Sequence, residues 1–100
     1  MVDPIDAIAH PGRRAMLRLV IDDEYPAGEL AERIGMSQPA TSQHLKILRD
    51  AGLVTVRVDG PRRLYRVDLH GLERLRSELD GFWEPSLQAL KLAAERGDWP

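Results

Sequence analysis

The feature that most constrains the fold is a very short connection between two amphipathic segments. Apolar residues between Leu30 and Ile34 share one face of a helix predicted over residues 27–34. A second helix is predicted to begin at Ser37, whose side chain can act as its N-cap. Only a turn of about three to four residues fits between the two segments. Such a tight connection predicts a helix-turn-helix over residues 27–51.

The second of these helices divides into two faces. Thr41, Leu45 and Leu48 recur at helical spacing and predict the side that packs on the core. Polar and small residues fall on the remaining surface. These outward residues are Gln38, Pro39, Ser42, Gln43 and Lys46. Gly52 is placed to end the helix, with Leu53 as the apolar residue that follows such an ending.

A β-hairpin is predicted directly after this helix. Leu53–Val58 and Leu64–Val67 are rich in β-branched and alternating apolar residues, which favours two short strands. Asp59-Gly60 starts the turn between them, and residues 61–63 fill it with Pro-Arg-Arg. The hairpin, over residues 53–67, therefore carries a basic tip.

Helices are also predicted at both ends of the chain. Asp3 caps a short helix over residues 3–10, and a second helix follows over residues 13–21. A long helix is predicted over residues 70–96, and Pro85 is expected to kink or split it. Its apolar residues step by threes and fours: Leu72, Leu75, Leu79, Trp83, Leu87, Leu90 and Ala94.

The order of these elements predicts one domain over residues 1–100, mainly α with a small β-hairpin (α+β), of the winged helix-turn-helix type. Charged residues make up 30% and hydrophobic residues 43% of the chain, which is ordinary for a globular protein. No run of apolar residues is long enough to cross a membrane, and the N-terminus does not resemble a signal peptide. A cytoplasmic protein is expected. The absence of cysteine excludes disulfides, thiolate metal sites and thiol redox chemistry.

Charge is unevenly distributed along the chain. Between Ser37 and Asp68 six basic residues face three acidic ones, a surplus of three positive charges. The net charge of the whole chain is −2, so the remainder carries −5. A basic segment on an acidic body indicates one surface that faces a polyanion.

A helix-turn-helix inserts the N-terminal part of its second helix into the DNA major groove. Glutamine can pair with adenine, serine can donate or accept, and lysine can hold phosphate or guanine. The free N–H groups near Ser37 can bind a phosphate, and Arg62 and Arg63 can reach a flanking groove or backbone. His44 is expected to be packed or partly buried rather than to read bases. The candidate DNA-binding residues are Ser37, Gln38, Pro39, Thr41, Ser42, Gln43, Lys46, Arg62 and Arg63.

Three strings carry a family resemblance: RRAMLRLV, GELAERIGMSQPATSQHLKILRDAGLVTVR and DGPRRLYRVD. They resemble the ArsR-type family of bacterial winged helix-turn-helix transcriptional repressors, closely over residues 13–68 and more loosely in the last helix. The resemblance implies a homodimer that binds double-stranded DNA at an inverted-repeat operator. It also implies a dimer interface formed by the first and last helices. Candidate interface residues are Ile5, Ile8, Leu72, Leu75, Leu79, Phe82, Trp83, Leu87 and Leu90.

The resemblance also raises the question of a metal sensor, because many members release DNA on binding metal. The family's cysteine site is absent from this sequence. The family's first ligand pair on the last helix falls on Leu69 and Gly71, and the second pair on Phe82 and Pro85. None of these side chains can ligate a metal. We therefore expect no cofactor and neither of these metal sites.

Asp68 and His70 then take structural roles, as a helix cap and a first-turn residue. Three effector hypotheses remain open: a small organic ligand, no effector, or a non-standard metal site built from His10, His70 and nearby carboxylates. The segment around Phe82, Trp83 and Pro85 could line an apolar pocket, but packing in the dimer core is favoured.

The sequence gives less support to two other classes of protein. Ser42, His44 and Asp50 sit on one helix at spacings that do not converge as a catalytic triad, and there is no glycine-rich phosphate loop. An enzyme is therefore not expected. A winged helix that binds protein rather than DNA is the other alternative, since fold alone does not fix function. The basic wing and the polar face of the second helix favour DNA.

Overall fold

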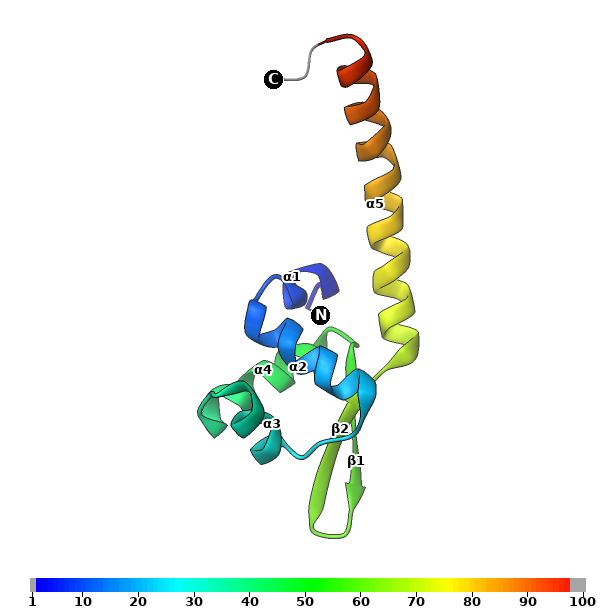
Figure 1. Cartoon of the computed structure of the whole chain (residues 1–100). Coiled ribbons are helices and arrows are strands. Elements are labelled where there is room, and N and C mark those ends of the chain that lie inside the picture. The colour runs from blue at the N-terminus through cyan, green and yellow to red at the C-terminus, as the bar shows by residue number, and fades with distance from the viewer. Residues whose placement is uncertain (1, 98–100) are drawn as a thin grey trace.

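The computed structural model describes residues 2–97, and within them a helical body carries a two-stranded hairpin and one projecting helix (Figure 1). The elements are α1 (Pro4–Ile8), α2 (Pro11–Asp22), α3 (Ala27–Ile34), α4 (Gln38–Asp50), β1 (Val54–Asp59), β2 (Arg62–Val67) and α5 (Leu69–Glu95). Because α5 extends away from the body, the chain measures 61 × 26 × 24 Å. The predicted winged helix-turn-helix is confirmed.

The hydrophobic core lies where α2, α3 and α4 meet under the base of the hairpin. Met16, Leu30, Leu45, Leu48 and Leu53 are almost completely buried there. Burying one such side chain stabilises the fold by about 1.5–3 kcal/mol relative to leaving it exposed. The core therefore fixes the inner face of α4 and leaves its other face free.

The turn between α3 and α4 is set by two residues whose chemistry suits it. Gly35 ends α3 with φ of 76°, a left-handed conformation that glycine adopts without strain. The Ser37 hydroxyl accepts a hydrogen bond of 3.3 Å from the Ala40 N–H and caps α4, as its sequence position predicts. The N-terminus of α4 is thereby held at the surface.

Asp68 joins the end of the hairpin to the start of α5. Its N–H donates to the carbonyl of Leu53 at 2.8 Å, which ties it to the segment after α4. Its carboxylate accepts a hydrogen bond of 3.1 Å from the Gly71 N–H. The structure thus agrees with the expectation that Asp68 caps the last helix.

The hairpin differs from the sequence prediction at its tip. Asp59 pairs with Arg62, so only Gly60 and Pro61 form the turn. Arg62 and Arg63 are residues of β2 rather than of the loop. Gly60 has φ of 60°, which lets the chain reverse within two residues, as tight hairpin turns require. Leu53, predicted to open the first strand, is instead a buried residue just before β1.

Two helices are longer or more continuous than predicted. The α2 helix begins at Pro11 rather than Arg13, because the His10 ring Nδ1 accepts the Gly12 N–H at 3.0 Å and caps it. Pro85 was expected to kink or split the last helix, and the split is wrong, since α5 runs through Pro85. Proline removes one helical hydrogen bond, and water can reach the freed carbonyl because this part of α5 is exposed.

Candidate nucleic-acid interface

The outward face of α4 carries the exposed residues that the sequence assigned to DNA. Gln38, Pro39, Ser42, Gln43 and Lys46 are all exposed. The residues on the opposite face of the helix include Leu45 and Leu48. These two side chains are buried, with exposed fractions of 1% and 0%. The helix therefore presents two amides, a hydroxyl and an ammonium group on one accessible surface, which are the groups that read base edges and phosphates.

Thr41 must be removed from the candidate DNA-binding residues. It is fully buried, and its hydroxyl donates to the Ser37 carbonyl at 2.9 Å. That hydrogen bond satisfies the buried hydroxyl within the helix, so no donor remains for DNA. Thr41 belongs to the core-facing side of α4, with Leu45.

Lys46 is paired on its own helix. Its ammonium Nζ lies 3.1 Å from the Asp50 carboxylate, with side chains 75% and 48% exposed. An exposed i,i+4 pair of this kind contributes only about 0.3–0.5 kcal/mol. Lys46 can therefore exchange Asp50 for a phosphate or base acceptor at little cost.

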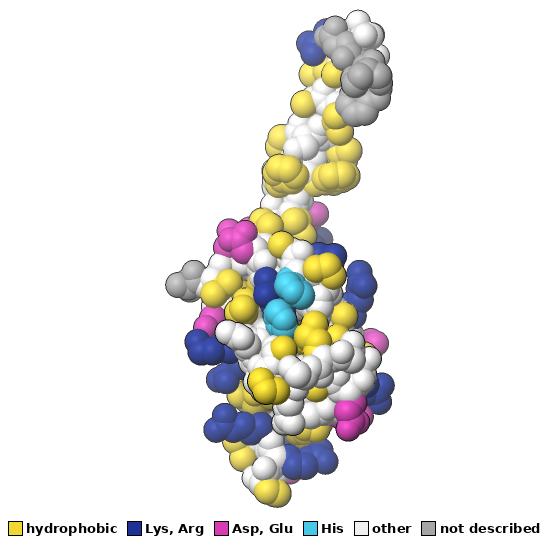
Figure 2. Space-filling model, turned by 90° about the vertical axis from the view of Figure 1, so that its left-hand side faces the viewer, with side chains coloured by type: hydrophobic (Ala, Val, Ile, Leu, Met, Phe, Trp, Pro, Cys, Tyr) yellow, Lys and Arg dark blue, Asp and Glu magenta, His cyan; other side chains and the backbone are white. Residues whose placement is uncertain are grey.

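The arginines of the hairpin fall into two groups. The Glu24 carboxylate accepts a hydrogen bond of 2.6 Å from Arg57 Nε and lies 3.9 Å from Arg66 Nη1. Arg62 and Arg63 have no ion pair within the described part of the chain and are exposed. The uncompensated charge of the wing is thus concentrated next to its tip, and Figure 2 shows Lys and Arg side chains around the lower part of the body.

Sequence reasoning missed the attachment of the hairpin to the body. Tyr25 pairs with Tyr65 in an isolated antiparallel bridge, with N–H to carbonyl distances of 3.1 and 2.8 Å. The Arg33 guanidinium stacks over the Tyr25 ring, 4.7 Å from its centre. In the sequence, Tyr25-Pro26 indicates only a break between helices. No local signal identifies its partner 40 residues later.

His44 is half-buried against α2, as its sequence position predicted. Its Nδ1 lies 3.2 Å from Arg13 Nη1, and its ring lies 4.5 Å from the His10 ring. Burial lowers the pKa of His44 from its ordinary value of 6.5, and the neighbouring His10 and Arg13 lower it further. The neutral imidazole is therefore favoured at neutral pH.

The described residues contain no group of three or more His, Asp, Glu or Cys side chains that could hold a metal ion. His70 is exposed in the first turn of α5, and Asp68 is engaged in capping. No described helix combines the length and apolar composition needed to cross a membrane.

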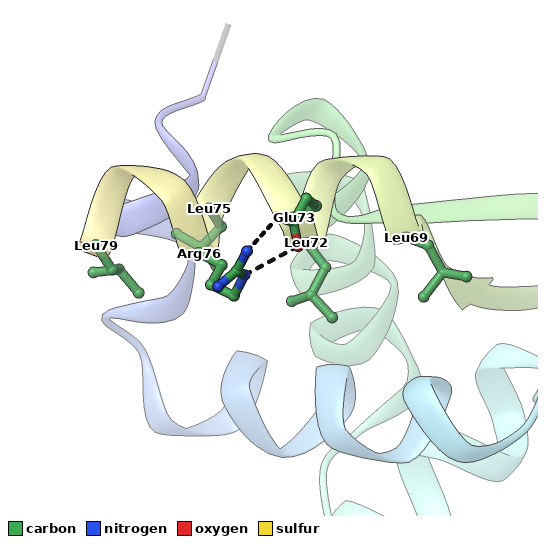
Figure 3. A pocket seen from close by; sticks show the side chains of 6 residues that line it. All are labelled: Leu69, Leu72, Glu73, Leu75, Arg76 and Leu79. Atoms are coloured by element: carbon green, nitrogen blue, oxygen red, sulfur yellow. Dashed lines mark hydrogen bonds and ion pairs between the residues drawn. The ribbon is translucent and has the colours of Figure 1, made fainter. Parts of the chain in front are cut away.

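Most of the predicted interface residues form an exposed apolar stripe on α5. Leu79, Phe82, Trp83, Leu87 and Leu90 are between 38% and 65% exposed. At the base of the helix the stripe borders an open apolar hollow of about 500 Å³ (Figure 3). The hollow is lined by Leu69, Leu72, Glu73, Leu75, Arg76 and Leu79.

Two details of this surface differ from the expectation. Leu75 is only 4% exposed and packs into the core of its own chain, so it offers little area to a partner. Arg76 interrupts the stripe, and its Nη2 lies 2.6 Å from the Glu73 carboxylate (Figure 3). The pair lowers the pKa of Glu73, chiefly through the Arg76 hydrogen bond.

The helix-turn-helix, the exposed polar face of α4 and the basic hairpin define a winged helix-turn-helix DNA-binding protein. Comparisons with known proteins give the family. Residues 10–56 match the model of the bacterial regulatory protein, arsR family. An HTH-type transcriptional regulator of Mycobacterium tuberculosis is 44% identical over 81 residues, which cover 81% of this chain and 76% of that protein. The chain belongs to the arsR family of bacterial regulatory proteins.

Other relatives agree with this assignment. The arsenical resistance operon repressor of Staphylococcus xylosus is 33% identical, over 76% of this chain and 73% of its own length. A crystal structure of a protein described as a possible transcriptional regulator for arsenical resistance has a TM-score of 0.81 and 40% identity, covering 92% of this chain and 96% of that one. A homodimeric winged helix-turn-helix DNA-binding domain from Mycobacterium bovis has a TM-score of 0.65 and 27% identity, covering 84% and 78%. The biofilm growth-associated repressor of Xylella fastidiosa matches over 55% of its length.

Proposed function

We propose that this chain is a homodimeric repressor that binds an inverted-repeat operator through α4 and the β1–β2 wing. The observation that carries the proposal is the exposed polar face of α4 beside a hairpin whose free arginines are Arg62 and Arg63. The names of the arsenical resistance operon repressor and of the biofilm growth-associated repressor support repression as the mode of action.

Within this proposal the residues of α4 and the wing have different tasks. Gln38, Ser42 and Gln43 contact base edges in the major groove, with Pro39 packed beside them. Ser37 lies at the helix N-terminus, where backbone N–H groups and the helix dipole favour a phosphate. Lys46 leaves Asp50 for an acceptor on the DNA. Arg62 and Arg63 hold flanking phosphates and so fix the position of the protein on the duplex.

The apolar stripe on α5 supports the dimer. Phe82 and Trp83 are 65% and 55% exposed, and burial of such aromatic side chains contributes strongly to an interface. Ile5 of α1 is also exposed, at 39%, while Ile8 is half-buried. Association of two copies through α1 and α5 removes this apolar surface from water. It also sets two α4 helices at a fixed spacing, which matches an inverted repeat.

The regulator acts in this proposal without the family's cysteine metal site, because the chain has no cysteine. Leu69, Gly71, Phe82 and Pro85 occupy the positions of the usual last-helix metal ligands and have no ligating side chains. Control by a small organic molecule, or by the protein's own concentration, is compatible with these residues. Repeating the DNA-binding assay with metals and candidate metabolites distinguishes these forms of control.

A mobility-shift experiment tests the proposed function. The protein is titrated against the DNA upstream of its own gene and against unrelated DNA of equal length. We expect a salt-sensitive complex that forms selectively on the upstream DNA. Because a protein-binding winged helix would show neither selectivity nor salt dependence here, the absence of both refutes the proposal.

A further inference from the structure

The geometry points to a phosphate-binding site formed by His10, His44 and Arg13 beside the N-terminal half of α4. The three residues come from the N-cap of α2, the first turn of α2 and the middle of α4. None belongs to the proposed DNA-binding set. The inference extends the proposed function, because α4 is the element offered to DNA.

The hydrogen bonds determine which nitrogen of each ring carries its proton. The His10 Nδ1 accepts from the Gly12 N–H at 3.0 Å. A guanidinium can only donate, so the His44 Nδ1, 3.2 Å from Arg13 Nη1, is the acceptor in that pair. Each neutral ring must therefore carry its proton on Nε2. The centres of the two rings lie 4.5 Å apart, and each ring retains one N–H donor.

The same hydrogen bonds disfavour a metal ion at this pair. A metal bound at Nε2 would require the proton to sit on Nδ1. That proton would oppose the Gly12 N–H at His10 and the Arg13 guanidinium at His44. The pair is thus arranged to donate hydrogen bonds to an acceptor such as a phosphate oxygen.

The positive charge at this site has no carboxylate partner among the described residues. Arg13 donates Nε to the Ala7 carbonyl at 2.5 Å and Nη2 to the Asp6 carbonyl at 3.3 Å, which are neutral acceptors. Burial is the main cause of the lowered pKa of His44, and the neighbouring His10 and Arg13 lower it further by disfavouring its protonation. The N-terminus of α2, with its own positive dipole end, lies at His10. An anion would relieve this repulsion.

The site adjoins the surface proposed to face DNA. A β-carbon on Gly12 would lie 2.3 Å from Met36 Cε and 3.1 Å from the His10 ring, so these residues are in close contact. Met36 directly precedes Ser37, the N-cap of α4. A phosphate of the DNA backbone that flanks the recognition helix is therefore one source of the anion. A free phosphate group on a small molecule is the other.

Proton NMR can test the site directly, because the chain contains three histidines and each gives a separate ring Cε1–H signal. Inorganic phosphate is titrated into the full-length protein at constant ionic strength, with chloride as the balancing anion. We expect saturable shifts of the His10 and His44 signals. The exposed His70 on α5 serves as the internal control and should not shift.

Two variants separate the sources of phosphate. In His10→Asn an asparagine keeps the N-cap acceptor but removes the ring, and in His44→Gln the amide oxygen can still accept from Arg13. If the DNA backbone is the source, both variants weaken binding to upstream and unrelated DNA equally, by about 10- to 100-fold for one lost charge-assisted contact. If free phosphate is the source, the variants abolish the phosphate shifts and leave DNA affinity unchanged.

The inference is overturned if phosphate shifts none of the three signals and both variants bind DNA as the native protein does. It is also overturned if His70 shifts as much as the other two, since that indicates a general ionic effect. Either result leaves the proposed function standing, because the selectivity lost on changing Gln38 and the overall affinity lost on changing the wing arginines are measured independently.

Discussion

Gly71 in the first turn of α5 lies directly against Gly52, two residues past the end of α4. A β-carbon on Gly71 would lie 1.7 Å from the Gly52 carbonyl oxygen and 2.7 Å from the carbonyl carbon. The segment just after α4 and the start of α5 are thus in backbone contact. This contact gives α5 a fixed origin relative to α4.

We expect Gly71→Ala to destabilise the fold by about 1–3 kcal/mol, because backbone atoms must move to admit the methyl group. If Gly71 did not contact Gly52, replacing this helical glycine by alanine would stabilise the fold by up to about 1 kcal/mol. Gly81→Ala is the matched control, since nothing lies within 4 Å of its β-carbon position. Urea unfolding of the native protein, Gly71→Ala and Gly81→Ala at equal concentration measures the three free energies of unfolding. Equal stability of the two variants contradicts the proposed contact.

Glu24→Gln is expected to make DNA binding less selective. The change frees Arg57 and Arg66, which the Glu24 carboxylate now holds at 2.6 and 3.9 Å. Affinity for unrelated DNA should rise, and the slope of log K against log salt should steepen by about 1–2 units for one or two added phosphate contacts. Glu95→Gln, at the far end of α5, changes the net charge equally and serves as the control. If Glu24→Gln and Glu95→Gln give the same slope of log K against log salt, Glu24 does not restrain the wing arginines.

The division of labour between wing and helix predicts two different losses. Arg62→Ala with Arg63→Ala should weaken binding to every DNA sequence and reduce the salt slope by about 2 units. Gln38→Ala should mainly reduce selectivity, costing about 1–3 kcal/mol on the preferred site. Fluorescence anisotropy on preferred and unrelated duplexes at several salt concentrations measures both. A loss of selectivity in the wing variant equal to that in Gln38→Ala is incompatible with this division.

Trp83→Asp is expected to give monomers. The indole is 55% exposed on the α5 stripe, and a buried unpaired carboxylate there opposes association strongly. Val58→Asp places the same charge on an exposed apolar residue of the wing and should leave the dimer intact. Light scattering after gel filtration measures the mass in solution. Only Trp83→Asp is expected to show the 11.3 kDa of a single chain. An unchanged mass in Trp83→Asp would move the interface elsewhere.

The lowered pKa of His44 predicts a pH dependence of stability. The unfolded chain binds a proton at this residue near pH 6.5, whereas the folded chain resists it through burial, His10 and Arg13. The unfolded state therefore holds more protons below about pH 6.5, and stability falls as the pH drops through this window. The contribution of His44 to the free energy of unfolding is fully present above pH 6.5, where the side chain is neutral in both states. We expect the free energy of unfolding, measured with urea, to fall less between pH 7.5 and 5.5 in His44→Gln than in the native protein. If the two proteins lose stability in parallel, His44 is not the source of the pH dependence.

The local elements could be predicted from the sequence because their signals are local. Ser37, Gly35 and Gly52 mark helix ends through backbone conformation and capping, and each does so in the structure. The tip of the hairpin was less well predicted. Pairing of Asp59 with Arg62 depends on strand register, which the composition of a turn does not fix alone.

The sequence by itself therefore determined the order of the elements, the two faces of α4 and the membership of a regulator family. Only the tertiary structure decided which residues meet across long separations. Arg13 and His44 are 31 residues apart, and Glu24 and Arg57 are 33 apart. Helical periodicity states which face of a helix is buried, but it does not state which neighbour covers that face. Those pairings follow from the packing of α2, α4 and the hairpin around one core, and they place the charges that a DNA backbone would meet.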